Sequence, residues 1–212
     1  MAAASKPRAT GTVALTTLAG EELGSAAQRD RRKRIIDATI ALASKGGYDA
    51  VQMRDVATSA GVALGTIYRY FSSKDHLLAA AMVEWTHDLE RRVGQRPPKG
   101  DTITDRVSDV LRRATRAMEK EPKLSEAVVT ALLSPDRGAA SCQEEVSASM
   151  TRILSTALGD DFDPAFKVQA TRTLGHVWFS ALIGWVNGWS GMEKVGDELE
   201  IATHLVLDQY GS

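Results

Sequence analysis

Residues 61–77, GVALGTIYRYFSSKDHL, place hydroxyl groups, aromatic rings and a guanidinium on one very short segment. Thr66, Tyr68, Arg69 and Tyr70 fall within five positions, just after a turn that begins with glycine. Hydroxyl and cationic side chains bind phosphate oxygens, and an arginine can donate two parallel hydrogen bonds to the edge of guanine. Because such groups are costly to bury together, the segment predicts a surface that contacts DNA.

Two short amphipathic helices around this turn are predicted to position these side chains. Residues 53–60 carry apolar positions at the i, i+3, i+4, i+7 spacing of one buried helix face: Met53, Val56, Ala57 and Ala60. After the turn 61–63, a second buried face is formed by Leu64, Ile67 and Phe71. The pair is a helix-turn-helix, and it leaves Gly65, Thr66, Arg69 and Tyr70 pointing outward with Tyr68 at the edge.

Lys74 follows at the start of the next predicted helix. A cation there opposes the helix dipole unless an anion lies nearby, so a DNA phosphate would explain it. The same spacing is also compatible with half-buried tyrosines and an ordinary surface lysine.

The charge distribution agrees with a head that faces a polyanion. Residues 26–75 carry a net charge of +4, whereas residues 76–212 carry −5. The lone cysteine, Cys142, excludes an intrachain disulfide and suits a reducing cytosol, and no signal peptide is evident, so a cytoplasmic protein is expected. Residues 173–192 lack Asp, Glu, Lys and Arg, but their polar residues and glycines favour a buried helix over a membrane span.

The remaining sequence predicts an all-α protein of nine helices. Residues 1–24 are expected to be a disordered tail, residues 25–72 the helix-turn-helix domain, and residues 73–212 a helical body for ligand binding and dimerisation. Helix starts are predicted from capping residues: Ser25 with Gln28, Ser72 with Asp75, Thr102, Pro122, Ser134-Pro135, Asp163-Pro164, and Ser190 with Glu193.

Residues 32–82, RKRIIDATIALASKGGYDAVQMRDVATSAGVALGTIYRYFSSKDHLLAAAM, closely resemble the DNA-binding head of the TetR family of one-component bacterial regulators. The head and residues 176–185, HVWFSALIGW, look most like the family members that repress steroid (cholesterol) catabolism in actinobacteria. The resemblance implies that Thr66, Tyr68, Arg69 and Tyr70 read the major groove while Gly65 permits close approach. It further implies phosphate contacts from Lys74 and Arg54. Many relatives carry Ser or Thr where residues 51–53 stand, and Gln52 is the candidate to replace that hydroxyl.

The C-terminal helices are predicted to form a homodimer that binds a palindromic operator. Ala181, Gly184 and Gly188 make a stripe of small residues beside a bulky stripe that includes Trp178 and Trp185. With Ile201 and Leu205 from the last helix, two copies are expected to form a four-helix bundle. The alternative is that the tryptophan stripe belongs to the core of one chain.

A bulky, apolar effector is expected to bind inside the body, as the resemblance implies. The candidate residues are Met82, Trp85, Leu89, Leu111, Met118, Leu132, Phe166, Trp178 and Phe179, and plain core packing is the alternative for each. His87 and His176 are candidate polar anchors. The resemblance implies a steroid-derived acyl-CoA as effector. The alternatives are a repressor of efflux genes induced by amphipathic drugs, where Glu84 or Asp88 would suit a cationic drug, and a repressor of fatty-acid metabolism induced by a fatty acyl-CoA.

No residue is assigned a catalytic or metal-binding role, and no cofactor is expected. The four histidines have no metal-ligand spacing, and P-loop, dinucleotide-binding and nucleophile-elbow motifs are absent from the sequence. The sequence therefore predicts a transcriptional repressor that a small molecule releases from DNA, and not an enzyme.

Overall fold

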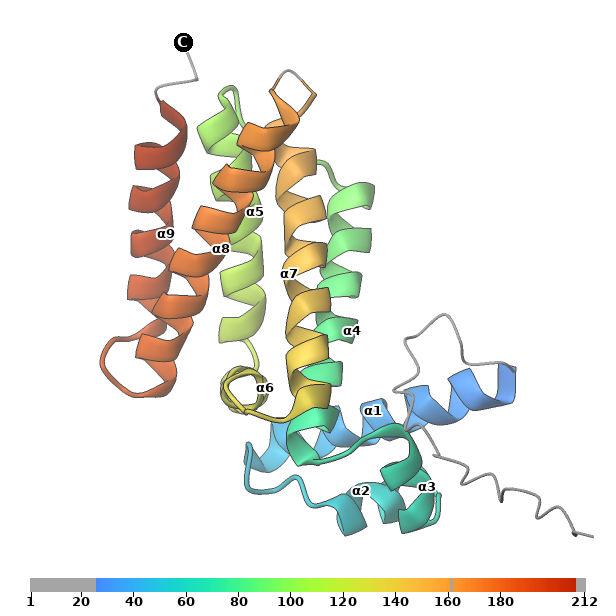
Figure 1. Cartoon of the computed structure of the whole chain (residues 1–212). Helices are drawn as coiled ribbons and strands as arrows, with labels where there is room; N and C mark the ends of the chain where they lie inside the picture. Colours follow the sequence, from blue (N-terminus) through green and yellow to red (C-terminus); the bar gives the residue numbers. More distant parts are fainter. Residues whose placement is uncertain (1–25, 161, 209–212) are drawn as a thin grey trace, which may run out of the picture.

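The computed structural model describes residues 26–160 and 162–208, and all regular secondary structure in these ranges is helical (Figure 1). The all-α prediction is confirmed. The predicted tail, residues 1–24, and the predicted cap Ser25 lie outside the described residues.

Three helices form a head at the end of the molecule opposite the last turn of α9 (Met192–Leu207), as Figure 1 shows. They are α1 (Ala26–Gly46), α2 (Met53–Ala60) and α3 (Leu64–Tyr70). The long helix α4 (Lys74–Gln95) then leads from the head into the body.

The body contains four further long helices, one of which, α7 (Arg137–Leu158), packs along α4, while one short helix lies across the bundle next to the head (Figure 1). The other long ones are α5 (Ile103–Glu119), α8 (Pro164–Val186) and α9, and the short one is α6 (Pro122–Leu132). A single apolar core runs from Ile35 in α1 to Leu207 in α9. The head is therefore packed onto the body rather than tethered to it.

Three of the predicted helix starts are confirmed. Thr102 forms a reciprocal capping box with Asp105, Pro122 opens α6, and Asp163 caps α8 through the backbone N–H groups of Ala165 and Phe166.

Three other predicted starts are wrong by one or two residues. Ser73, not Ser72, caps α4, because Ser72 instead donates to Asp136. Asp136 caps α7 in place of the predicted Ser134, whose hydroxyl donates to Asp75. The helix α9 begins after Gly191, without the side-chain cap expected from Ser190.

His76 joins the head to the body. Its ring lies edge-on to Phe71, with ring centroids 5.2 Å apart, and Nδ1 accepts a hydrogen bond from the backbone N–H of Ser72. On the other side Gly138 of α7 packs so closely that a Cβ added there would lie 2.2 Å from the imidazole Nδ1. Burial lowers the pKa of His76, so the ring is held here in its neutral form.

Candidate nucleic-acid interface and ligand cavities

The turn between α2 and α3 is fixed by backbone geometry and by two buried side chains. Gly61 takes a left-handed conformation with φ 65°, and its N–H closes the end of α2. Ile67 and Phe71 are 0% and 1% exposed, so they anchor α3 in the core. Arg34 of α1 also donates to the carbonyl of Ala60. A helix of only seven residues is thereby held in one orientation.

The side of α3 that faces away from the core presents three of the four predicted recognition residues. Tyr68 is 55% exposed, Arg69 is exposed, and Thr66 is half-buried. Gly65 is exposed, and a Cβ added to it would meet nothing within 4 Å. Since nothing within the described chain requires a glycine there, its absent side chain fits close approach by an external partner.

Tyr70 does not point outward as expected. Its ring is half-buried against the core, and its hydroxyl is buried without a hydrogen-bond partner. The reason is that Tyr70 lies one turn after Ile67, so it shares the buried side of α3. The Arg69 guanidinium lies 5.4 Å from the centre of the Tyr70 ring, which makes Tyr70 a support for Arg69.

Lys74 has partners within the protein. Its Nζ donates to the carbonyl of Tyr48 at 3.3 Å and lies 3.7 Å from the centre of the Tyr48 ring. The Tyr48 hydroxyl in turn donates to Asp75 at 2.5 Å, and burial together with this contact raises the pKa of Tyr48 to about 12. These contacts hold the Lys74 side chain against Tyr48, in the segment between α1 and α2.

Gln52, at the N-cap position of α2, and Arg54, in its first turn, are both exposed. The Gln52 side chain donates to the carbonyl of Asp49 at 3.1 Å and makes no capping hydrogen bond to α2. In the basic run of α1, Arg32 pairs with Glu84, Lys33 with Asp37 and Arg34 with Asp30.

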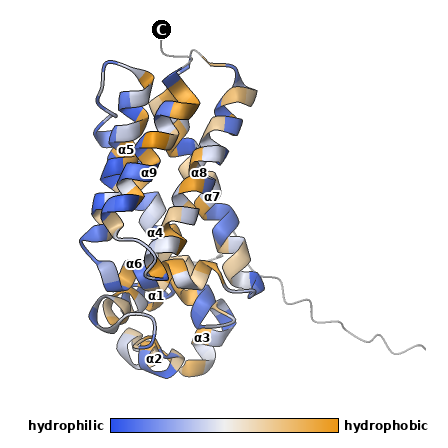
Figure 2. Cartoon of the chain, turned by 90° about the vertical axis from the view of Figure 1, so that its left-hand side faces the viewer, coloured by the Kyte–Doolittle hydropathy of each residue, from blue (hydrophilic) through white to orange (hydrophobic). Residues whose placement is uncertain are grey.

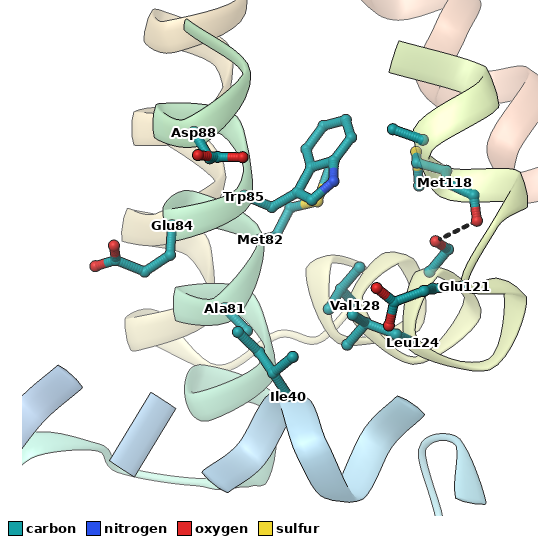
Figure 3. Close-up of a pocket in the computed structure, with 12 residues that line it drawn as sticks. Ile40, Ala81, Met82, Glu84, Trp85, Asp88, Met118, Glu121, Leu124 and Val128 are labelled. Atoms are coloured by element: carbon teal, nitrogen blue, oxygen red, sulfur yellow. Dashed lines mark hydrogen bonds between the residues drawn. The ribbon is translucent and has the colours of Figure 1, made fainter. Parts of the chain in front are cut away.

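A first cavity, of about 220 Å³, lies between the head helix α1 and helices α4, α5 and α6. Figure 3 shows Trp85 and Met82 directed from α4 toward Met118, with Ile40 of α1 below them. The cavity therefore touches the head directly. Its lining also includes three carboxylates, Glu84, Asp88 and Glu121.

A second cavity, of about 360 Å³, lies between α4, α6, α7 and α8. Of the predicted ligand residues it gathers Met82, Leu132, Trp178 and Phe179. Its lining also contains Arg172 and His176, both exposed, and includes no carboxylate.

Three predicted ligand residues lie outside both cavities. Leu89 is 6% exposed in the core. Leu111 borders only a space of about 10 Å³ beside α9. Phe166 stacks on Phe162 with ring centroids 5.1 Å apart. Each was predicted from its apolar type, which is the same for a core residue and for a cavity residue.

The sequence missed Ile40 and Arg172. Ile40 belongs to the head, where no ligand contact was expected, and Arg172 looks like an ordinary exposed residue of an amphipathic helix. No local pattern distinguishes either from its neighbours.

Two of the three acidic residues beside the first cavity, Glu84 and Asp88, are already paired with arginines, while Glu121 accepts a hydrogen bond from the Ser44 hydroxyl. Glu84 accepts from Arg32 at 3.2 Å, and Figure 3 shows its side chain on the opposite side of α4 from Trp85. Asp88 pairs with Arg91 at 2.9 Å and with Arg92 at 2.5 Å. Their charges are therefore compensated without a ligand. Of the two candidate histidine anchors, His87 lies near Glu145 at 3.2 Å, and only His176 lines a cavity.

The predicted dimer stripe on α8 is partly internal. Ala181 is 6% exposed, and a Cβ added to Gly184 would lie 3.4 Å from the Ser190 hydroxyl, so both small residues serve close packing within one chain. The residues that remain on the surface are different. Trp185 is half-buried and Gly188 is exposed, while Trp189, Ile201 and Leu205 are 75%, 60% and 78% exposed.

Figure 2 looks onto this side of the molecule, where hydrophobic residues follow both α8 and α9. Ile201 and Leu205 are one turn apart on α9, so they form a single exposed apolar strip.

Comparison with known proteins agrees with this architecture. Residues 35–81 match the family described as "Bacterial regulatory proteins, tetR family", and residues 100–206 match "Tetracyclin repressor-like, C-terminal domain". The chain is 42% identical over 196 residues to the HTH-type transcriptional repressor KstR of Rhodococcus jostii, covering 92% of each chain. The chain belongs to the TetR family.

Solved structures of the family have the same fold. A TetR transcriptional regulator from Rhodococcus sp. RHA1 superposes with a TM-score of 0.78 at 30% identity, covering 87% of this chain and 100% of the other. FadR of Thermus thermophilus, solved in complex with lauroyl-CoA, superposes with a TM-score of 0.65 at 21% identity, covering 85% and 95%.

Membership of the TetR family makes the chain a DNA-binding transcriptional repressor and confirms that it is not an enzyme. Cys142 is buried, and burial raises the pKa of its thiol to about 11, so it is a poor nucleophile at neutral pH. Among the described helices, none has the length and apolar character needed to cross a bilayer.

Proposed function

We propose that the chain is a dimeric repressor that binds a palindromic operator and leaves it when a bulky CoA thioester, steroid-derived, occupies the body. The observation that carries the effector class is the second cavity, whose lining is largely apolar and whose charged and titratable members are Arg172 and His176 alone. An apolar cavity bordered by an arginine and by a histidine that can donate a hydrogen bond suits a ligand with a hydrophobic body and an anionic tail. The resemblance of the head and of residues 176–185 to repressors of steroid catabolism supports a steroid as that body.

On the DNA side, we assign base contacts to Tyr68 and Arg69, close approach to Gly65, and phosphate contacts to Thr66, Lys74, Gln52 and Arg54. Tyr70 supports Arg69 from beneath. Two heads related by two-fold symmetry would meet half-sites about 34–36 Å apart, or a multiple of that spacing.

A fatty acyl-CoA is the second candidate effector, since it has the same anionic tail. The FadR of Thermus thermophilus shares the fold and was solved with lauroyl-CoA, although 21% identity supports only the architecture. A cationic drug is disfavoured, because Glu84 and Asp88 are already paired with arginines.

A titration separates these effectors. The protein is first used to select its own operator from a random duplex pool, and the complex is then followed by fluorescence anisotropy. Three compounds are added in parallel: the CoA thioester of a steroid carboxylic acid, lauroyl-CoA, and a quaternary ammonium drug. Release by the steroid thioester at micromolar concentration is the expected result. Release by lauroyl-CoA alone would support the fatty-acyl alternative, and release by the drug alone would overturn the thioester proposal.

A further inference from the structure

The two cavities lie on either side of a thin partition. Met82 lines both of them, Trp85 lines the first, and Trp178 lines the second. The two indole rings lie with centroids 6.4 Å apart and planes tilted by 42°. Three side chains from α4 and α8 therefore separate a space next to α8 from a space next to the head.

The partition is built from groups that can move. Methionine is unbranched and adapts its shape readily, and Trp85 is only half-buried. Trp178 is 4% exposed, and its Nε1–H is buried without a hydrogen-bond partner. Because a buried donor without an acceptor is unfavourable, this arrangement does not satisfy the Trp178 side chain, and a rotation that brings Nε1 to an acceptor would.

The volumes of the two cavities indicate what such a rotation would achieve. Ligand sites typically enclose roughly 300–1,000 Å³. The first cavity, at about 220 Å³, is below this range, and the second, at about 360 Å³, is near its lower limit. A space that joined the two cavities would lie well within the range.

We infer that the two cavities are halves of one effector site, which becomes continuous when Met82, Trp85 and Trp178 move apart. In this state the apolar body of the ligand reaches from α8 to Ile40 of α1, and a ketone or hydroxyl oxygen on it accepts the Nε1–H of Trp178. This inference rests on the proposed function and adds the path by which a ligand in the body contacts the DNA-binding head.

The first test fills the cavity that the ligand would enter last. Ala117 lines the first cavity and is absent from the lining of the second. In Ala117→Phe, affinity for the steroid thioester, measured by calorimetry, is expected to fall roughly tenfold or more, because the added ring occupies the distal half of the site. The matched control is Ala140→Phe, an exposed position of α7 outside both cavities, with melting curves recorded for both variants.

The outcomes separate this inference from the proposed function. If the wild type does not bind the steroid thioester, the proposed effector class is wrong, and the joined site with it. If the wild type binds and Ala117→Phe binds equally well, only the joined site is wrong.

The second test removes the donor while it keeps a ring in place. Trp178→Phe is expected to lose roughly three- to tenfold in affinity for a thioester with a ring ketone, and to bind the matched deoxy steroid thioester as the wild type does. An equal loss for both ligands would show that Trp178 contributes packing alone, and would overturn the proposed hydrogen bond.

Discussion

Tyr68 and Tyr70 lie two residues apart on α3 and meet different surroundings. Tyr68 is 55% exposed, whereas the Tyr70 hydroxyl is sealed in the protein without a partner. The sequence predicts Tyr70 as outward-facing and Tyr68 at the edge, because a seven-residue helix gives barely two turns of periodicity. In so short a helix, the pattern does not define the edge of the buried face to better than one residue. Ile67 and Phe71, whose large apolar side chains leave no such ambiguity, are buried as predicted.

This difference gives a test at single-residue resolution. Tyr68→Ala and Arg69→Ala are each expected to weaken operator binding by about 1–3 kcal/mol, because each removes a contact to DNA, with little change in melting temperature. Tyr70→Phe is the matched variant: it removes a buried unpaired hydroxyl, so the free energy of unfolding should stay equal or rise by up to about 1 kcal/mol. Operator affinity and chemical denaturation are measured for all three. Unfolding of Tyr68→Ala would place Tyr68 in the core and contradict its role at the surface.

At the scale of elements, the sequence predicts which segments are helical and in what order, but it predicts the first residue of only some of the helices. Thr102, Pro122 and Asp163 mark helix starts from local sequence alone. Thr102 has its capping partner Asp105 three residues later, the ring of Pro122 suits the first helical position, and Asp163 stands directly before a proline. Ser72 and Ser73 are adjacent hydroxyls of equal capping ability, and only Asp136, 64 residues away from Ser72, decides that Ser73 caps α4. Long-range contacts of this kind leave no local signal.

The contact between α4 and α7 is a close long-range contact of this kind. Gly138→Ala would place a Cβ 2.2 Å from the His76 ring, which itself packs on Phe71 at the end of α3. The substitution is expected to cost about 1–3 kcal/mol of stability through overpacking, as measured by denaturant unfolding. The control is Gly94→Ala, near the end of α4, where an added Cβ meets nothing within 4 Å. That variant should gain up to about 1 kcal/mol from helix propensity. Equal stability of the two variants would contradict the close contact.

At the scale of the whole molecule, sequence periodicity identifies helix faces but does not say which faces meet within one chain. Ala181 and Gly184 have the spacing of an interhelical contact, and the structure uses it inside the chain. The substitution Gly184→Glu would therefore disturb the fold of a single chain, so it could not test dimerisation. Ile201 and Leu205 are equally apolar, yet they stay on the surface because Val195, Leu199 and Leu207 already fill the core side of α9.

A substitution in the exposed strip on α9, Ile201 and Leu205, can therefore test dimerisation without damage to the fold. Leu205 is 78% exposed, so Leu205→Glu removes little packing from a single chain, but it would bury an unpaired carboxylate between two copies. The variant is expected to sediment as a monomer with unchanged helical content. Because one head alone makes few contacts, operator affinity should fall roughly 100-fold or more. Leu133→Glu is the matched control, since Leu133 is also an exposed leucine, at 47%, but lies at the end of α6 and away from α9. If Leu205→Glu sediments as Leu133→Glu does and binds the operator as tightly, the two-fold assembly does not use α9, and the palindromic spacing assigned to the operator loses its basis.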